Sequence, residues 1–113
     1  LSSADRQRFV TEWKDVQSLF VDDPARAVNE ANQLINDIMA ARGYTASTAD
    51  ERMENISAAY PRVVNSYREA CDILAEYQTG RASTESLRRA LVSYRTLFDE
   101  LLGESREEYR RVS

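Results

Sequence analysis

The sequence predicts an all-α fold: an antiparallel four-helix bundle with an additional short helix between helices two and four. Only 3 Gly and 2 Pro interrupt 113 residues, of which 42% are hydrophobic and 30% are charged, a balance typical of one helical domain. Apolar residues recur at intervals of three and four, as on one face of an α-helix. The stretch Phe20-Val21-Asp22-Asp23-Pro24 ends one such helix and starts the next, so these two helices must fold back on each other.

The first helix is expected over residues 4–20, with the hydroxyl of Ser3 as its N-cap. Its apolar residues form one stripe that another helix must cover. The stripe consists of Phe9, Trp13, Val16 and Phe20.

The turn that follows carries two adjacent carboxylates, Asp22 and Asp23. Asp23 can cap the second helix, and Pro24 fits its first position because the N–H that proline lacks would be unpaired there. In a second interpretation the two carboxylates bind a hard cation or a basic residue of a partner, but a cation needs further oxygen ligands that the sequence does not identify. We therefore assign Asp22, Asp23 and Pro24 to a structural cap and turn, and we expect no metal site.

The second helix begins at Pro24, and Gly43 supplies the left-handed residue that closes it after Arg42. Its apolar residues are numerous enough to contact two neighbouring helices. They are Ala27, Val28, Ala31, Leu34, Ile35, Ile38 and Met39. A separate face carries Asn29, Asn32 and Asn36, for which solvent exposure is the ordinary interpretation and an amide ladder that binds a polar partner is the alternative.

A loop is expected over residues 44–47, followed by a short helix over residues 49–59 that Ser47 or Thr48 caps. Pro61 then marks a break. The fourth helix is expected over residues 61–78, with Gly80 as its terminator. Its inward residues are Tyr60, Val63, Val64, Tyr67, Ala70, Cys71, Leu74 and Tyr77.

The fifth helix is expected to begin after Ser83, to run to about residue 102 and to end at Gly103. Its inward residues are Leu87, Ala90, Leu91, Tyr94, Leu97, Phe98, Leu101 and Leu102. Residues 1–103 therefore form the single bundle domain, and residues 104–113 form a charged C-terminal tail or helix extension.

Composition excludes several function classes. The formal net charge of −4 disfavours a nucleic-acid surface, which needs clustered basic charge. The absence of His removes the commonest general base near neutral pH and the commonest zinc ligand. Cys71 is the one cysteine, and its place in an apolar stripe predicts a buried thiol. No stretch approaches the roughly 18 apolar residues that cross a bilayer, so we expect a cytoplasmic protein that does not bind a membrane.

A resemblance adds to this interpretation. The segments Trp13-Lys14-Asp15-Val16-Gln17, Phe20-Val21-Asp22-Asp23-Pro24 and Ala27-Val28 resemble a family of small, largely uncharacterised bacterial helical proteins with the motif Trp-x-x-Ile/Val-Gln-x-x-Phe-Val-Asp-Asp-Pro. The pair Ile38-Met39 and the segment from Tyr94-Arg95 to Phe98 resemble later parts of the same pattern. This family often has Asp where the present chain has Asn32. The resemblance implies a helical fold and names no catalytic residue.

Three aromatic residues are candidates for a pocket or an interface: Trp13, Tyr67 and Tyr94. Trp13 could line a cavity between helices or pack as an ordinary core residue. Tyr67 and Tyr94 fall near the middle of inward stripes, where each hydroxyl needs a partner. A polar pocket would supply such partners, and so would hydrogen bonds to Asn, Arg or carboxylates within a structural core.

Wide apolar stripes without a visible catalytic set lead to the hypothesis of a non-catalytic helical module for protein–protein interaction or self-association. Its partner would be another protein or a second copy in a homo-oligomer, and it would need no cofactor. The alternative is a small-molecule carrier or sensor with a site between the bundle helices, near Trp13, Tyr67 and Tyr94. An enzyme is the least favoured class, because only a cleft with strongly shifted pKa values would support it.

Overall fold

The computed structural model describes the backbone of residues 1–112 and the side chains of residues 1–103. Over these residues the chain forms five α-helices and one short 3-10 helix, and it forms no strand. The elements are α1 (Ser3–Asp22), α2 (Pro24–Ala41), α3 (Ala49–Ala59), η1 (Pro61–Val63), α4 (Val64–Gln78) and α5 (Thr84–Val112). The predicted all-α class is confirmed.

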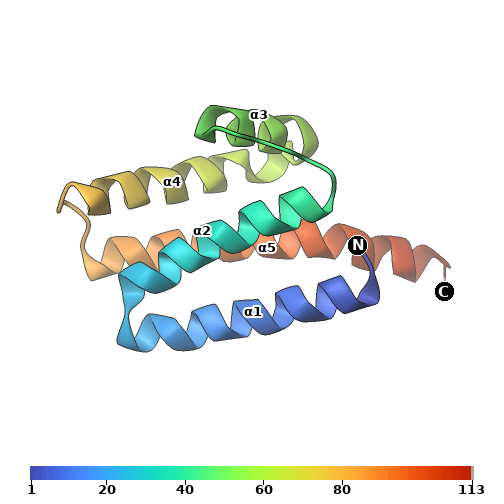
Figure 1. Cartoon of the computed structure of the whole chain (residues 1–113), viewed down its shortest axis with the longest axis horizontal. Helices are drawn as coiled ribbons and strands as arrows, with labels where there is room; N and C mark the ends of the chain where they lie inside the picture. The colour runs from blue at the N-terminus through green and yellow to red at the C-terminus, as the bar shows by residue number, and fades with distance from the viewer. Residues whose placement is uncertain (113) are drawn as a thin grey trace.

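Figure 1 shows the helices as a stack in which α1 lies beside α2, α4 lies above α5, and α3 lies on α4. The closest helix contacts are those of α1 with α2, α2 with α5, and α4 with α5. Helix α3 packs chiefly on α4 and η1, not on α2. Helix α3 therefore lies apart from α2, the helix that precedes it in the chain, and this arrangement positions the candidate site.

A single residue, Asp23, separates α1 from α2. Its backbone N–H donates to the Leu19 carbonyl at 2.8 Å, which ends α1. Its Oδ1 atom accepts from the Arg26 N–H at 3.2 Å, which caps α2, and Pro24 is the first residue of that helix. The other end of α1 differs from the expectation, because the N-cap is Ser2, whose Oγ accepts from the Asp5 N–H at 3.0 Å, and not Ser3.

The ends of α2, α3 and α4 follow from local chemistry. Gly43 has a φ of +96° after α2, and Gly80 has a φ of +76° after α4, which are left-handed conformations that glycine adopts at little cost. Of the two expected caps for α3, Thr48 fills the role, and its Oγ1 accepts from the Glu51 N–H at 3.1 Å. The Glu51 carboxylate in turn accepts from the Ser47 N–H at 3.0 Å, which is close to a capping box.

Two expected helix boundaries are wrong. The segment from Pro61 is first a 3-10 helix, and α4 begins only at Val64, because proline offers no N–H to the preceding turn. Helix α5 continues through Gly103 to Val112, since Gly103 does not adopt a positive φ and glycine inside a helix costs only about 1 kcal/mol. Residues 104–112, expected as a tail or helix extension, have helical backbone, and Ser113 lies outside the described residues.

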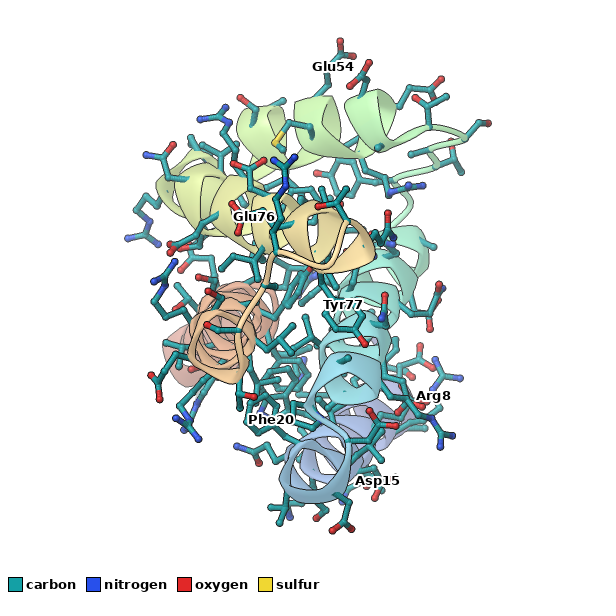
Figure 2. All side chains as sticks on the ribbon, turned by 90° about the vertical axis from the view of Figure 1, so that its left-hand side faces the viewer. Arg8, Asp15, Phe20, Glu54, Glu76 and Tyr77 are labelled. Carbon is teal, nitrogen blue, oxygen red and sulfur yellow. The ribbon has the colours of Figure 1, made fainter. Side chains whose placement is uncertain are left out.

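The core consists mainly of the inward-facing apolar side chains of α1, α2, α4 and α5. The Trp13 ring stacks on Phe98 of α5, with ring centroids 5.1 Å apart. Figure 2 shows Phe20 between α1 and α5, whereas Arg8 and Asp15 lie at the outer surface. The expectation for Tyr77 is wrong, because its side chain is 41% exposed in the last turns of α4, while Ile73 is 2% exposed and belongs to the core.

Candidate functional site

The structure places the three predicted site residues inside the core, where each is at most 6% exposed. Tyr67 on α4 and Tyr94 on α5 both lie beside the thiol of Cys71. Trp13 on α1 is engaged separately, in its stack with Phe98. In these positions the three side chains are covered by other residues of the described chain.

A small polar cluster lies where α2, α4 and α5 meet. The Tyr94 hydroxyl donates to Asn32 Oδ1 at 3.0 Å. The buried phenol therefore has a hydrogen-bond partner within the core, which is one of the two arrangements expected from the sequence. Asn32 is half-buried and not on an open solvent face. The sequence spacing indicates that Asn32 lies near the core, because it is one helical turn from the core residues Val28 and Ile35.

The titratable groups of this cluster are held neutral. Burial, assisted by the neighbouring Cys71 thiol, raises the pKa of Tyr67 to about 12, while the Arg52 guanidinium opposes this shift. Burial likewise raises the pKa of Tyr94 and of the Cys71 thiol, which is half-buried and less enclosed than expected. A thiol with a raised pKa is a poor nucleophile at neutral pH. The cluster is therefore suited to packing and hydrogen bonding.

A cavity of about 370 Å³ opens between α2, the segment 42–48 and α3. We call it the α2–α3 groove. In Figure 1 the segment after α2 crosses back toward the far end of α3, and α3 packs on α4 and η1, so α2 and α3 become the two walls. The volume falls in the range of about 300–1,000 Å³ that small-molecule sites occupy. The groove is lined by Gln33, Asn36, Asp37, Met39, Ala40, Tyr44, Thr45, Ala46, Arg52, Asn55 and Ile56.

The floor of the α2–α3 groove is apolar and fixed. Met39 is 6% exposed and Ile56 is 1% exposed, and both belong to the core. The loop is tied to α3 by Asn55, whose Nδ2 donates to the Thr45 carbonyl at 3.2 Å. Tyr44 is held by an edge-on contact with the Tyr60 ring, with ring centroids 6.5 Å apart.

Polar side chains converge on the α2–α3 groove from both walls. From α3, Arg52 is half-buried and makes no ion pair with any residue whose side chain is described. From α2, the Asp37 carboxylate accepts from Gln33 Nε2 at 2.9 Å. Asn36, from the predicted amide face, also lines the groove. Arg52 and Asp37, in contrast, were not predicted as site residues, because the groove depends on where the short helix packs.

The turn carboxylates do not form a larger acidic site in the described part of the chain. Asp22 is the exposed last residue of α1, and Asp23 is the cap of α2. Among the described residues, no group of three or more His, Cys, Asp or Glu side chains is placed to hold a metal ion. The described helices also include none with the length and apolar character needed to cross a membrane.

Comparisons with models of known protein families, with curated proteins and with solved structures gave no match. The resemblance seen in the Trp13–Pro24 region therefore stays a prediction.

Proposed function

We propose that this chain is a non-catalytic helical module that binds a small polar molecule in the α2–α3 groove. The observation that carries the proposal is one cavity with an apolar floor and polar groups converging from two helices. Binding sites for small molecules combine these features, because apolar area supplies affinity and a few polar groups fix orientation. The site is displaced from the one expected near Trp13, Tyr67 and Tyr94.

The proposal includes the finer architecture: an antiparallel four-helix bundle of α1, α2, α4 and α5, to which α3 is added. The packing of α1 with α2, α2 with α5 and α4 with α5 supports it, as does the tight turn at Asp23. In this scheme the bundle is the rigid scaffold, and α3 with its loop forms one wall of the site.

A non-catalytic role is supported by the neutral state of the buried titratable groups. Raised pKa values keep Tyr67, Cys71 and Tyr94 protonated at neutral pH, and proton transfer catalysis favours groups that titrate near the working pH. We also propose a cytoplasmic location, since a single thiol that forms no disulfide within the chain fits a reducing compartment.

The experiment is a comparison of two tryptophan substitutions at adjacent exposed alanines of α2. Ala40 lines the groove, whereas Ala41 is exposed outside it. Native mass spectrometry of freshly purified protein is expected to show the same added mass on the wild type and on Ala41→Trp, and none on Ala40→Trp. A ligand-free wild type that also binds no member of a fragment library at the groove would contradict the proposal.

Association with a protein partner or with a second copy stays a prediction. The most exposed large apolar side chains are Val21 at 83% and Val92 at 60%, and they belong to different helices, α1 and α5. Sedimentation velocity over a range of concentrations tests self-association. A constant monomer mass would contradict the homo-oligomer.

A further inference from the structure

We propose that the α2–α3 groove selects a small amino carboxylate with an apolar side chain, for which L-leucine is the representative probe. This inference rests on the proposed function and names the ligand class. It follows from the charges on the two walls of the groove and from the character of its floor.

Arg52 is the anchor for the carboxylate. It is the cationic side chain among the residues that line the groove, and within the part of the chain with described side chains it has no ion pair. It lies beside the Tyr67 hydroxyl, and this contact restrains the guanidinium. A guanidinium binds a carboxylate through two parallel hydrogen bonds, which is a strong and directional interaction.

Asp37 is the anchor for the ammonium group. It lies on α2, the wall opposite Arg52. Gln33 donates one hydrogen bond to Asp37 Oδ1, and a carboxylate can accept about four. Asp37 is exposed and forms no ion pair with Arg52, so neither charge neutralises the other across the groove.

The two walls together favour a zwitterion over a singly charged molecule. A simple anion would be attracted by Arg52 and repelled by Asp37. A simple cation would be attracted by Asp37 and repelled by Arg52. A molecule with both charges satisfies both walls and leaves the site neutral. Ala40 and Ala46 line the groove above the buried Met39 and Ile56, and this apolar lining suits an aliphatic side chain and not a polar one.

The test titrates the isotope-labelled full chain with three probes while backbone amide shifts are recorded by NMR. The probes are L-leucine, 4-methylpentanoate, which lacks the ammonium group, and 3-methylbutylamine, which lacks the carboxylate. L-leucine is expected to give saturable shifts at Met39, Tyr44 and Asn55, and to bind about tenfold or more tighter than either matched probe. Equal affinity for all three, or no saturable shift with L-leucine, would overturn the inference.

Two substitutions separate the roles of the walls. Arg52→Gln is expected to weaken L-leucine about tenfold and not to weaken 3-methylbutylamine, whose ammonium group Arg52 repels, whereas Arg52→Lys keeps part of the affinity for L-leucine. Asp37→Asn is expected to weaken L-leucine but not 4-methylpentanoate. Arg89→Gln and Asp99→Asn, exposed on α5 outside the groove, are the matched controls and are expected to behave as the wild type.

The failure of this inference differs from the failure of the proposed function. If L-leucine does not bind but the wild type carries a mass that Ala40→Trp loses, the ligand class is wrong and the groove is still the binding site. If L-leucine does not bind, the wild type is ligand-free and no fragment binds at the groove, both proposals are wrong.

Discussion

At the scale of single residues, burial decides which aromatic side chains matter to the fold. Trp13 and Phe98 stack with ring centroids 5.1 Å apart, and Tyr94 is fully buried with its hydroxyl on Asn32. Sequence spacing was enough to place Trp13, Tyr67 and Tyr94 in the core. The partner of Tyr94 was not predicted, because Asn32 was assigned to a solvated amide face although it lies one helical turn from the core residues Val28 and Ile35.

Trp13→Ala is expected to destabilise the protein by about 3–5 kcal/mol, because it removes a buried indole and leaves a cavity beside Phe98. Urea denaturation followed by circular dichroism measures the loss. Val21→Ala serves as the control at an 83% exposed position and is expected to change stability by no more than about 0.5 kcal/mol. Equal effects of the two substitutions would mean that the Trp13 stripe is not a core element.

Asn32→Ala is expected to cost about 1–3 kcal/mol, because it removes the Oδ1 atom that accepts from the buried Tyr94 hydroxyl. In a Tyr94→Phe background the same substitution should cost much less, since no donor is left unpaired. A double-mutant cycle from urea denaturation of the four proteins measures this coupling. Additive effects would show that the hydrogen bond does not contribute to stability.

Stability is expected to fall in alkaline solution. The unfolded chain releases the Tyr67 proton near the ordinary pKa of 10.0, whereas the folded chain releases it near about 12. Between these values the folded state binds more protons than the unfolded state, so the free energy of unfolding decreases as pH rises. Unfolding measured from pH 8 to 11 is expected to show a shallower decline for Tyr67→Phe, and an unchanged slope would contradict this assignment.

At the scale of the helices, end chemistry was more predictable than helix length. Asp23, Pro24, Gly43 and Thr48 act at the ends that their local chemistry indicated, because capping and left-handed glycine depend on a few neighbouring residues. Gly103 shows why helix length was predicted less well, since glycine ends a helix only where the chain turns away. Tyr77 shows why burial was mispredicted, because a periodic pattern does not reveal where a neighbouring helix stops covering a side chain.

Gly103→Ala and Gly43→Ala are expected to have opposite effects. Gly103 is helical and an added Cβ would meet nothing within 4 Å, so alanine should stabilise the protein by up to about 1 kcal/mol. Gly43 has a φ of +96°, so alanine there should destabilise it by about 1 kcal/mol or more. Thermal unfolding of both variants measures the effects, and a destabilising Gly103→Ala would argue against a continuous α5.

At the scale of the whole molecule, the candidate site arises from how a minor element packs. The four longer helices have strong apolar stripes that indicate their burial from sequence. Helix α3 has one buried hydrophobic residue, Ile56, so its position was not predictable. Because α3 rests on α4 and η1, it leaves the α2–α3 groove, and Figure 2 shows Glu54 on the outer side of α3 at the molecular surface.

The most direct test of this account compares Ala40→Trp with Ala41→Trp in the NMR titration with L-leucine. Saturable shifts at groove residues are expected in Ala41→Trp and none in Ala40→Trp, with both variants folded as judged by dispersed spectra. The same shifts in both variants, or shifts centred on Trp13 and Phe98, would contradict the placement of the binding site in the α2–α3 groove.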